Sequence, residues 1–487
     1  MSDSAANLSI LELQEDYRRG KRSPSEALHD LIESVEAKDG ELGAYLSFDP
    51  ETALKEAENS DVQLPLGGIP IAIKDLINVE GQPCSCASKF LESSYTSTYD
   101  ATVISRLRKA GAIPLGRTNM DEFAMGSSTE NSGIRSSLNP WDKSRIPGGS
   151  SGGSAICVAN DTAIAALGSD TGGSIRQPAS FCGCVGLKPT YGRVSRYGLV
   201  AFASSLDQIG PMTKTSRDAA LLLSVISGSD PRDSTALSAD VPDYENQLTG
   251  EVKGLRIGLP KEYFTDGINP DVRKCIDDAI SHLENLGAEI VDVSLPHTEY
   301  AVATYYIIAT AEASANLARF DGVRYGNRAN QPDDIIDHYR RSRANGFGEE
   351  VKRRIILGTY VLSSGYNDAY YVRAQKARTL IRKDFDTAFE QADVLISPTA
   401  PTPAFRLGEK SSDPLQMYLA DIFTIAANLS GICGASTPCG SVKTDEGTSL
   451  PVGLQVLGPH LAEGAVLRVT DAFEKTTEWH RRRPPTG

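Results

Sequence analysis

No apolar segment of the 487-residue sequence approaches the roughly 20 residues needed to cross a membrane. The first residues have neither the basic start nor the apolar stretch of a secretory signal. We therefore expect a cytoplasmic protein without membrane contact. Acidic residues outnumber basic ones by 63 to 49, which gives a net charge of −14. Because phosphate contacts need clustered Lys and Arg, the chain is not expected to bind nucleic acid tightly by itself.

Ligand patterns for metals and nucleotides are also missing. The eight cysteines include the pairs Cys84/Cys86 and Cys182/Cys184 but no C-x-x-C pair, and structural zinc sites are built from such pairs or from nearby histidines. We expect free thiols, buried or partly buried, and no metal. The sequence has no G-x-x-x-x-G-K-S/T loop, no G-x-G-x-x-G turn after a strand and no H-E-x-x-H helix. No cofactor is therefore predicted for this chain.

The order of predicted elements indicates a single α/β domain over residues 1–487. Residues 1–60 are predicted to be helical, because a capping box at Ser23 and Glu26 precedes apolar residues at helical spacing. Residues 64 to about 214 are rich in glycine and short apolar runs, which is typical of buried strands and tight turns. Strands and helices interleave beyond them, and no repeat or long linker divides the chain.

Two serine- and glycine-rich segments, 147–154 and 170–176, carry the first sign of chemistry. Glycine and serine also make ordinary flexible turns, but both segments lie between apolar runs, where a floppy loop would leave backbone groups unpaired. Consecutive glycines let the backbone approach a ligand and point successive N–H groups at one spot. Such an arrangement suits an oxyanion, with a serine at its end to attack.

A histidine base for that serine has little support. Residues 148–152 match the G-x-S-x-G nucleophile elbow, whose mechanism needs a later histidine on a loop and an acid to orient it. Among the six histidines, His282 falls on the polar face of a predicted helix and His480 in a basic tail. His297 and His460 follow prolines and remain conceivable bases, but nothing around them indicates a site.

A lysine can replace histidine if it is neutral. Lys74 follows a strand-like stretch in which Ile69, Ile71 and Ile73 alternate and no other charge occurs. Burial at the end of such a strand disfavours the ammonium, and lowering a lysine pKa from 10.4 to about 7.5 costs roughly 4 kcal/mol. A surface lysine at a strand end is the commoner case, so this pattern alone leaves both interpretations open.

Segments 147–154 and 168–179 together resemble the signature of the amidase-signature family. The resemblance implies an α/β fold with a central mixed β-sheet flanked by helices on both faces, and a Ser–cis-Ser–Lys triad. Matched position by position, Ser174 would be the nucleophile, Ser150 the bridging serine and Lys74 the base, all within the 64–214 region.

The same resemblance implies two backbone features. The peptide between Gly149 and Ser150 would be cis. The backbone N–H groups of Thr171, Gly172 and Gly173, with Ser174 itself, would form the oxyanion hole.

Segments 115–126, 205–211 and 358–366 resemble one branch of this family, the glutamine-hydrolysing subunits of tRNA-dependent amidotransferases. The resemblance implies that the chain releases ammonia from glutamine for transamidation of Glu-tRNA(Gln), Asp-tRNA(Asn) or both. A B subunit would activate the misacylated tRNA with ATP and Mg²⁺, and a small C subunit would clamp the two. This chain itself would need no cofactor.

The resemblance further implies a glutamine pocket. Arg354 would bind the carboxylate, for which a guanidinium fork is suited. Asp421 would pair with the α-ammonium or hold the amide, and Tyr305 would line the pocket. Without the resemblance, an exposed salt bridge explains Arg354 and Asp421 equally well. A stand-alone amidase acting on another amide, or an inactive scaffold that only binds its partner, are the alternative functions.

Overall fold

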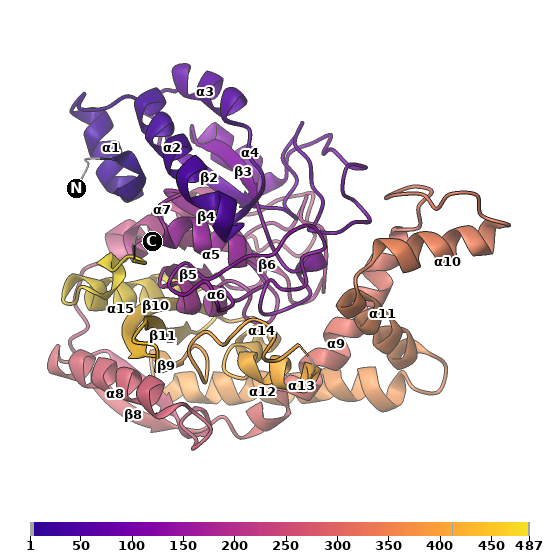
Figure 1. The fold of residues 1–487 in the computed structure, drawn as a ribbon. Helices are drawn as coiled ribbons and strands as arrows, with labels where there is room; N and C mark the ends of the chain where they lie inside the picture. The colour runs from indigo at the N-terminus through magenta and orange to yellow at the C-terminus, as the bar shows by residue number, and fades with distance from the viewer. Residues whose placement is uncertain (1–3, 412, 486–487) are drawn as a thin grey trace.

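The computed structural model describes residues 4–411 and 413–485, and within them a single mixed sheet of eleven strands forms the centre of the molecule (Figure 1). The order across the sheet is β1-β3-β2-β4-β6-β5-β10-β11-β9-β7-β8. The strands are β1 (Tyr45–Ser47), β2 (Pro70–Lys74), β3 (Ile113–Thr118), β4 (Ala165–Asp170), β5 (Val185–Lys188), β6 (Gln208–Thr213), β7 (Arg256–Pro260), β8 (Glu289–Val293), β9 (Val394–Pro398), β10 (Cys433–Lys443) and β11 (Ser449–Gly458).

The sheet is parallel at β3-β2-β4 and again at β9-β7-β8, and antiparallel from β4 through β9. Its flanking helices are α1 (Ile10–Arg18), α2 (Pro24–Leu42), α3 (Pro50–Glu58), α4 (Thr102–Lys109), α5 (Gly152–Ala159), α6 (Arg176–Cys182), α7 (Ser216–Ile226), α8 (Pro270–Asn285), α9 (Ala301–Asn316), α10 (Ile335–Gly346), α11 (Glu349–Leu362), α12 (Arg373–Gln391), α13 (Pro414–Tyr418), α14 (Ile425–Ser430) and α15 (Glu463–Lys475). The predicted α/β class and mixed sheet are confirmed.

Helices cover both faces of the sheet, as strand β2 illustrates. Side chains alternate between faces along a strand: Ile71 and Ile73 pack in the large core that includes α7, whereas Ala72 packs in a smaller core with α5. Lys74 has the same parity as Ala72 and therefore points to the α5 face. This parity brings the lysine to the end of the sheet where α5 begins.

The described part of region 1–60 contains the helices α1, α2 and α3, but one segment of it is a strand. Helices α1 and α2 both begin with capping boxes, at Ser9/Glu12 and Ser23/Glu26. Between α2 and α3, however, Tyr45–Ser47 forms the edge strand β1, paired antiparallel with β3. Only the tertiary pairing with β3 makes this short segment a strand, and a local pattern does not reveal it.

Helices α10 and α11, with the outer ends of α9 and α12, form a projection from the body of the molecule, and α10 lies farthest out (Figure 1). Helix α11 contacts α9, and α12 contacts α9 and α14. Among the helices of the described residues, none is long and apolar enough to span a bilayer. The eight cysteines are free thiols, seven of them buried and Cys275 partly so.

Candidate active site

Lys74 is the last residue of β2 and has no solvent-exposed surface. Its Nζ lies 2.7 Å from Ser150 Oγ and 2.8 Å from Ser151 Oγ. Burial lowers the pKa of Lys74 to about 7, against the opposing influence of nearby carboxylates, Asp121 and Asp170 among them. A fraction of the side chain is therefore a neutral amine near pH 7, which is the form that can accept a proton.

Ser150 lies just before α5, and the Gly149–Ser150 peptide is cis, as predicted. A Cβ on Gly149 would come within 2.1 Å of Asp121 Oδ2 and 2.8 Å of the backbone nitrogen of Ser128. Packing therefore requires glycine at position 149. The close fit places the Ser150 hydroxyl against Lys74.

Ser174 lies in the turn between β4 and α6, and Asp170 organises that turn. Asp170 Oδ1 accepts the N–H of Gly173 at 2.8 Å, and its Oδ2 accepts Nε of Arg176 at 3.0 Å. Although burial alone would raise it, the Arg176 charge lowers the pKa of Asp170 to about 2. The turn is thus fixed by a permanently ionised carboxylate, and Ser174 stays 8% exposed at its tip.

Ser174 is joined to Ser150 through the backbone rather than through the hydroxyls. The N–H of Ser151 donates to the carbonyl of Ser174 at 3.1 Å. Within the described chain, no hydrogen bond links Ser174 Oγ to Ser150 Oγ. Catalytic hydrogen bonds often form or tighten only when substrate binds. The absence of a direct bond between the two hydroxyls is therefore compatible with a proton path through Ser174 and Ser150.

The predicted oxyanion donors differ in their availability. The N–H of Gly173 is engaged by Asp170, whereas those of Thr171 and Gly172 donate to no acceptor within residues 4–411 and 413–485. The carbonyl of Gly172 accepts the hydroxyl of Thr424 at 2.6 Å. Three of the four predicted donors, the N–H groups of Thr171, Gly172 and Ser174 itself, are therefore open within the described residues.

Arg354, on α11, is buried and lies among aromatic rings. Its Nε donates to Glu350 Oε1 at 2.8 Å, one helical turn earlier. The guanidinium lies 5.3 Å from the ring centre of Tyr306 and 5.7 Å from that of Tyr418. Neither terminal Nη group donates to an acceptor of the described chain. The fork itself remains open. The alternative, an exposed salt bridge between Arg354 and Asp421, has no support, because both residues are buried and no ion pair joins them within the described residues.

Asp421 ends a short 3₁₀ helix, Leu419–Asp421, and is buried. One oxygen, Oδ2, accepts the hydroxyl of Ser127, while Oδ1 is buried with no hydrogen-bond partner in the described structure. Burial raises the pKa of Asp421 to about 7, although Ser127 and the Arg354 charge act to lower it. A buried oxygen without a hydrogen-bond partner lowers the stability of the fold. A hydrogen-bond donor of a bound substrate would satisfy it.

Tyr305 connects this acidic group to the nucleophile turn. A Cβ on Gly172 would lie 2.8 Å from the Tyr305 hydroxyl, and one on Gly173 would lie 2.3 Å from Thr424 Oγ1. Thr424 is three residues after Asp421. The structure thus brings Tyr305 and Asp421 beside the Gly172–Gly173 turn, and the Arg354 charge affects the pKa of both Tyr305 and Asp421.

Several polar residues of the site were not predicted. Ser151 and Ser169 both contact Lys74, and Glu350 holds Arg354. The i, i+4 spacing of Glu350 and Arg354 is a signal that could have indicated their pairing. The run of adjacent serines offers no such signal, because only the folded backbone decides which hydroxyl faces the lysine.

The histidines lie in other contacts. His297 Nδ1 is 2.8 Å from Asp384 Oδ1, and His460 Nε2 is 3.2 Å from the carbonyl of Ser430. Neither forms a hydrogen bond with Ser150 or Ser174. The histidine alternative therefore has no geometric support.

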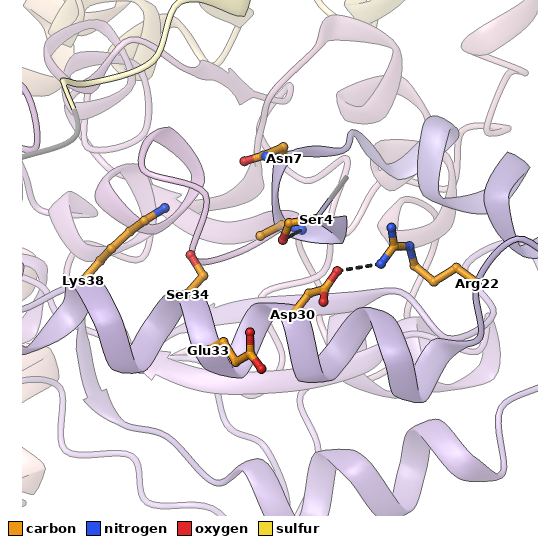
Figure 2. Close-up of a pocket in the computed structure, with 8 residues that line it drawn as sticks. Ser4, Asn7, Arg22, Asp30, Glu33, Ser34 and Lys38 are labelled. Carbon is orange, nitrogen blue, oxygen red and sulfur yellow. Dashed lines mark hydrogen bonds and ion pairs between the residues drawn. The ribbon is translucent and has the colours of Figure 1, made fainter. Parts of the chain in front are cut away.

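A separate hollow of about 450 Å³ lies at the N-terminal end, between the 3₁₀ helix Ala5–Asn7 and α2 (Figure 2). Three of its charged residues are engaged: Asp30 accepts Arg22 at 2.6 Å, and Lys38 donates to the carbonyl of Asn160 at 2.7 Å. No nucleophile faces a base there, so this hollow is not a second catalytic candidate.

A buried lysine against a cis-linked serine, with a second serine on a glycine turn of a mixed sheet, is the arrangement of serine hydrolases that use lysine in place of histidine. The chain belongs to the amidase family, whose model matches residues 26–467. The predicted membership is thereby confirmed.

Three relatives within the family carry the same name. The chain is 59% identical over 481 residues to the A subunit of glutamyl-tRNA(Gln) amidotransferase from Methylacidiphilum infernorum, covering 99% of this chain and 96% of that one. It is 55% identical over 482 residues to the protein of the same name from Geotalea daltonii, covering 98% of each. The crystal structure of the Thermotoga maritima protein of that name matches with a TM-score of 0.81 at 42% identity, covering 98% of this chain and 96% of that one.

Proposed function

We propose that the chain is the glutamine-hydrolysing subunit of a tRNA-dependent amidotransferase and works in the cytoplasm. The observation that carries the catalytic part is the contact of 2.7 Å between the buried Lys74 Nζ and Ser150 Oγ, at a lysine whose pKa is lowered to about 7. The similarity at 54% identity or more to proteins that are named as the A subunit of this amidotransferase supports the wider assignment.

The proposed reaction uses the three triad residues in sequence. Ser174 Oγ attacks the side-chain amide carbon while its proton passes to Ser150, and the Ser150 proton passes to Lys74. The N–H groups of Thr171 and Gly172 bind the developing oxyanion. The proton then returns through Ser150 to the leaving nitrogen, ammonia departs, and water hydrolyses the ester on Ser174 by the same path to give glutamate. Gly173 would have to release Asp170 to join the oxyanion hole.

Glutamine recognition is proposed at the three residues around the turn. The open Nη fork of Arg354 would bind the α-carboxylate in two hydrogen bonds. The unpartnered Oδ1 of Asp421 would accept the α-ammonium, or the amide N–H in the other orientation. Tyr305 would close the pocket above Gly172. These assignments place the charged end of glutamine at Arg354 and its amide toward Ser174.

We further propose that B and C subunits complete the enzyme. The B subunit would activate Glu-tRNA(Gln), Asp-tRNA(Asn) or both with ATP and Mg²⁺, and would use the ammonia. The projection supports a role in docking, because it exposes apolar and aromatic side chains, which mark interaction sites when they cluster. On α11 and in the segment that follows it, through the π-helix Asp368–Val372, these include Ile356, Leu357, Tyr360, Tyr366 and Tyr370.

Active-site labelling tests the catalytic part directly. A fluorophosphonate should react with the purified chain, and peptide mapping should find the label on Ser174. A label on another residue, or none, would contradict the triad. Glutamate release from glutamine, compared with ammonia release from amides that lack an α-carboxylate, then separates a glutaminase from a stand-alone amidase.

A further inference from the structure

Three hydroxyl oxygens surround the amine of Lys74, and only one of them belongs to the proposed triad. Nζ lies 2.7 Å from Ser150 Oγ, 2.8 Å from Ser151 Oγ and 3.0 Å from Ser169 Oγ. The carbonyl oxygen of Ser169 is more distant, at 3.5 Å. All three serines are buried. Nζ has no further hydrogen-bond partner within the described residues.

The direction of the Ser151 contact follows from its other bonds. Ser151 Oγ donates to the carbonyl of Ser169 at 3.1 Å and accepts the N–H of Ser169 at 3.3 Å. A hydroxyl has one hydrogen, and the carbonyl takes it. Toward Lys74, Ser151 can therefore act only as an acceptor. Its position is fixed by the backbone of β4, which also carries Ser169.

The three hydroxyl oxygens around Nζ suit the protonated form of Lys74 better than the neutral form. An ammonium has three N–H groups and no lone pair, and three hydroxyl oxygens stand ready to accept them. In the neutral amine one contact must reverse, so that a hydroxyl donates to the nitrogen lone pair. Ser151 cannot do so. Ser150, at the shortest distance, is the hydroxyl that delivers the proton in the proposed reaction.

We infer that Ser151 and Ser169 are positioning residues, which accept N–H groups of Lys74 as it becomes an ammonium and hold it against Ser150. A buried ammonium is costly without such acceptors. The two serines would stabilise it at the moment when Ser174 loses its proton. The inference rests on the part of the proposed function in which Lys74 takes up a proton, and not on the identity of the amide.

Within the part of the chain that the structure describes, the ionisable groups that face Lys74 form no hydrogen bond with it, so Ser150, Ser151 and Ser169 remain its direct acceptors. The carboxylates of Asp121, Asp170 and Asp207 and the thiol of Cys86 raise the pKa of Lys74 from a distance. Each carboxylate is engaged elsewhere: Asp121 accepts the N–H of Thr129 at 2.9 Å, Asp170 pairs with Arg176, and Asp207 accepts the hydroxyl of Thr171 at 2.7 Å. These groups are unchanged by a substitution at Ser169.

The test is the pH dependence of fluorophosphonate inactivation of the full chain, with Ser169→Ala compared with the wild type. This probe needs the nucleophile and its base but no glutamine pocket. Loss of one acceptor disfavours the ammonium, so the acid limb of the profile should move to lower pH. The plateau rate should fall about 10- to 100-fold, the range of a hydrogen bond to a charged group. The KM for glutamine should stay unchanged, because Arg354 and Asp421 are intact.

Matched variants make the result decisive. Ser154→Ala removes another buried hydroxyl of the same region, bonded to the carbonyl of Leu167 at 3.0 Å and not to Lys74, and should leave the acid limb in place. If Ser169→Ala does not fold, Ser169→Cys keeps the size with a poor acceptor. An unshifted limb, or a shift to higher pH, in a variant with the wild-type melting temperature would overturn the inference.

Failure of the inference and failure of the proposed function are distinguishable. A wild-type chain that reacts with the fluorophosphonate at Ser174 but does not hydrolyse glutamine would contradict the glutaminase assignment alone. In that case the Ser169→Ala profile still decides whether the serine positions Lys74. Ser151→Ala should shift the limb in the same direction, and a shift confined to one of the two variants would overturn the shared role.

Discussion

The hydroxyl of Thr424 donates to the carbonyl of Gly172 at 2.6 Å, and this bond ties the proposed substrate-binding side of the site to the nucleophile turn. Thr424 follows Asp421 by three residues, and its own hydroxyl also contacts the carbonyl of Asp421 at 3.0 Å. Gly172 is two residues before Ser174. Because one side chain bridges the two segments, the distance between the proposed ammonium site and the nucleophile is fixed by the fold.

Removal of the nucleophile should abolish catalysis and spare the fold. Ser174→Ala deletes one hydroxyl and should lower glutamate release by at least about 10³-fold, with little change in the melting temperature. Triad members act as a unit, so Ser150→Ala added to Ser174→Ala should cost little more. Rates measured on both single variants and the double variant decide this: near-additive losses would speak against a shared proton path.

Substitution of the base should show whether Lys74 acts by its proton or by its charge. Arginine keeps a positive charge but does not lose its proton near neutrality. Lys74→Arg should therefore lose activity as completely as Lys74→Ala. Steady-state rates with glutamine, together with melting temperatures to verify folding, provide the measurement. A variant with arginine that keeps a sizeable share of the rate would assign Lys74 a purely electrostatic role.

Much of this site could be predicted from the sequence, because its proposed catalytic residues lie in three short segments, the end of β2 and residues 147–154 and 168–179. Alternation of Ile71, Ala72 and Ile73 indicated a buried strand, and Lys74 is buried at its end. The glycine runs indicated close backbone approach, which the fit of Gly149 against Asp121 requires. These features are local, so a pattern of residue types carries them.

Other features depend on contacts between distant segments. The hydrogen bond from the Gly173 N–H to Asp170 depends on the conformation of the turn. Which of the adjacent serines contacts Lys74 depends on the folded backbone. Asp421 is buried with Oδ2 bonded to Ser127, which is 294 residues away in sequence, and with Oδ1 left without a partner in the described structure. Residue types alone carry no information on such geometry.

Loss of the guanidinium should impair glutamine binding selectively. Removing one partner of a buried charged contact typically costs 2–5 kcal/mol or more, so Arg354→Ala should raise the KM for glutamine by about 30-fold or more. Simple amides without a carboxylate should be hydrolysed at the wild-type rate. Arg340→Ala, at an exposed arginine of α10, serves as the control. Equal losses on both kinds of substrate would point to a structural role for Arg354 within its aromatic surroundings.

The pH profile should differ between glutamine and simple amides. Lys74 has its pKa lowered to about 7 and acts when neutral; Asp421 has its pKa raised to about 7 and binds an ammonium when charged. Both active forms gain population as the pH rises through 7. Because kcat/KM reports the free enzyme, its logarithm for glutamine should rise below pH 7 with a slope of about two, and for a simple amide with a slope of about one.

Asp421→Asn supplies the control for that profile. The amide cannot ionise, so the glutamine slope should fall to about one and KM should rise. Equal slopes for the two substrates in the wild type would exclude Asp421 as the ammonium site. A slope for glutamine that stays near two in the variant would assign the second ionisation to another group.

Partner subunits should control the rate of glutamine hydrolysis. The chain has 49 basic against 63 acidic residues and no phosphate-binding loop, and phosphate contacts need clustered Lys and Arg. Purified alone, it should therefore hydrolyse glutamine slowly and bind tRNA no better than non-specifically. Adding B and C subunits, charged tRNA and ATP should raise glutamate release, since ammonia formed without an acceptor is wasted. The matched control omits only ATP. If the partners change nothing while the isolated chain rapidly hydrolyses other amides, the chain is a stand-alone amidase.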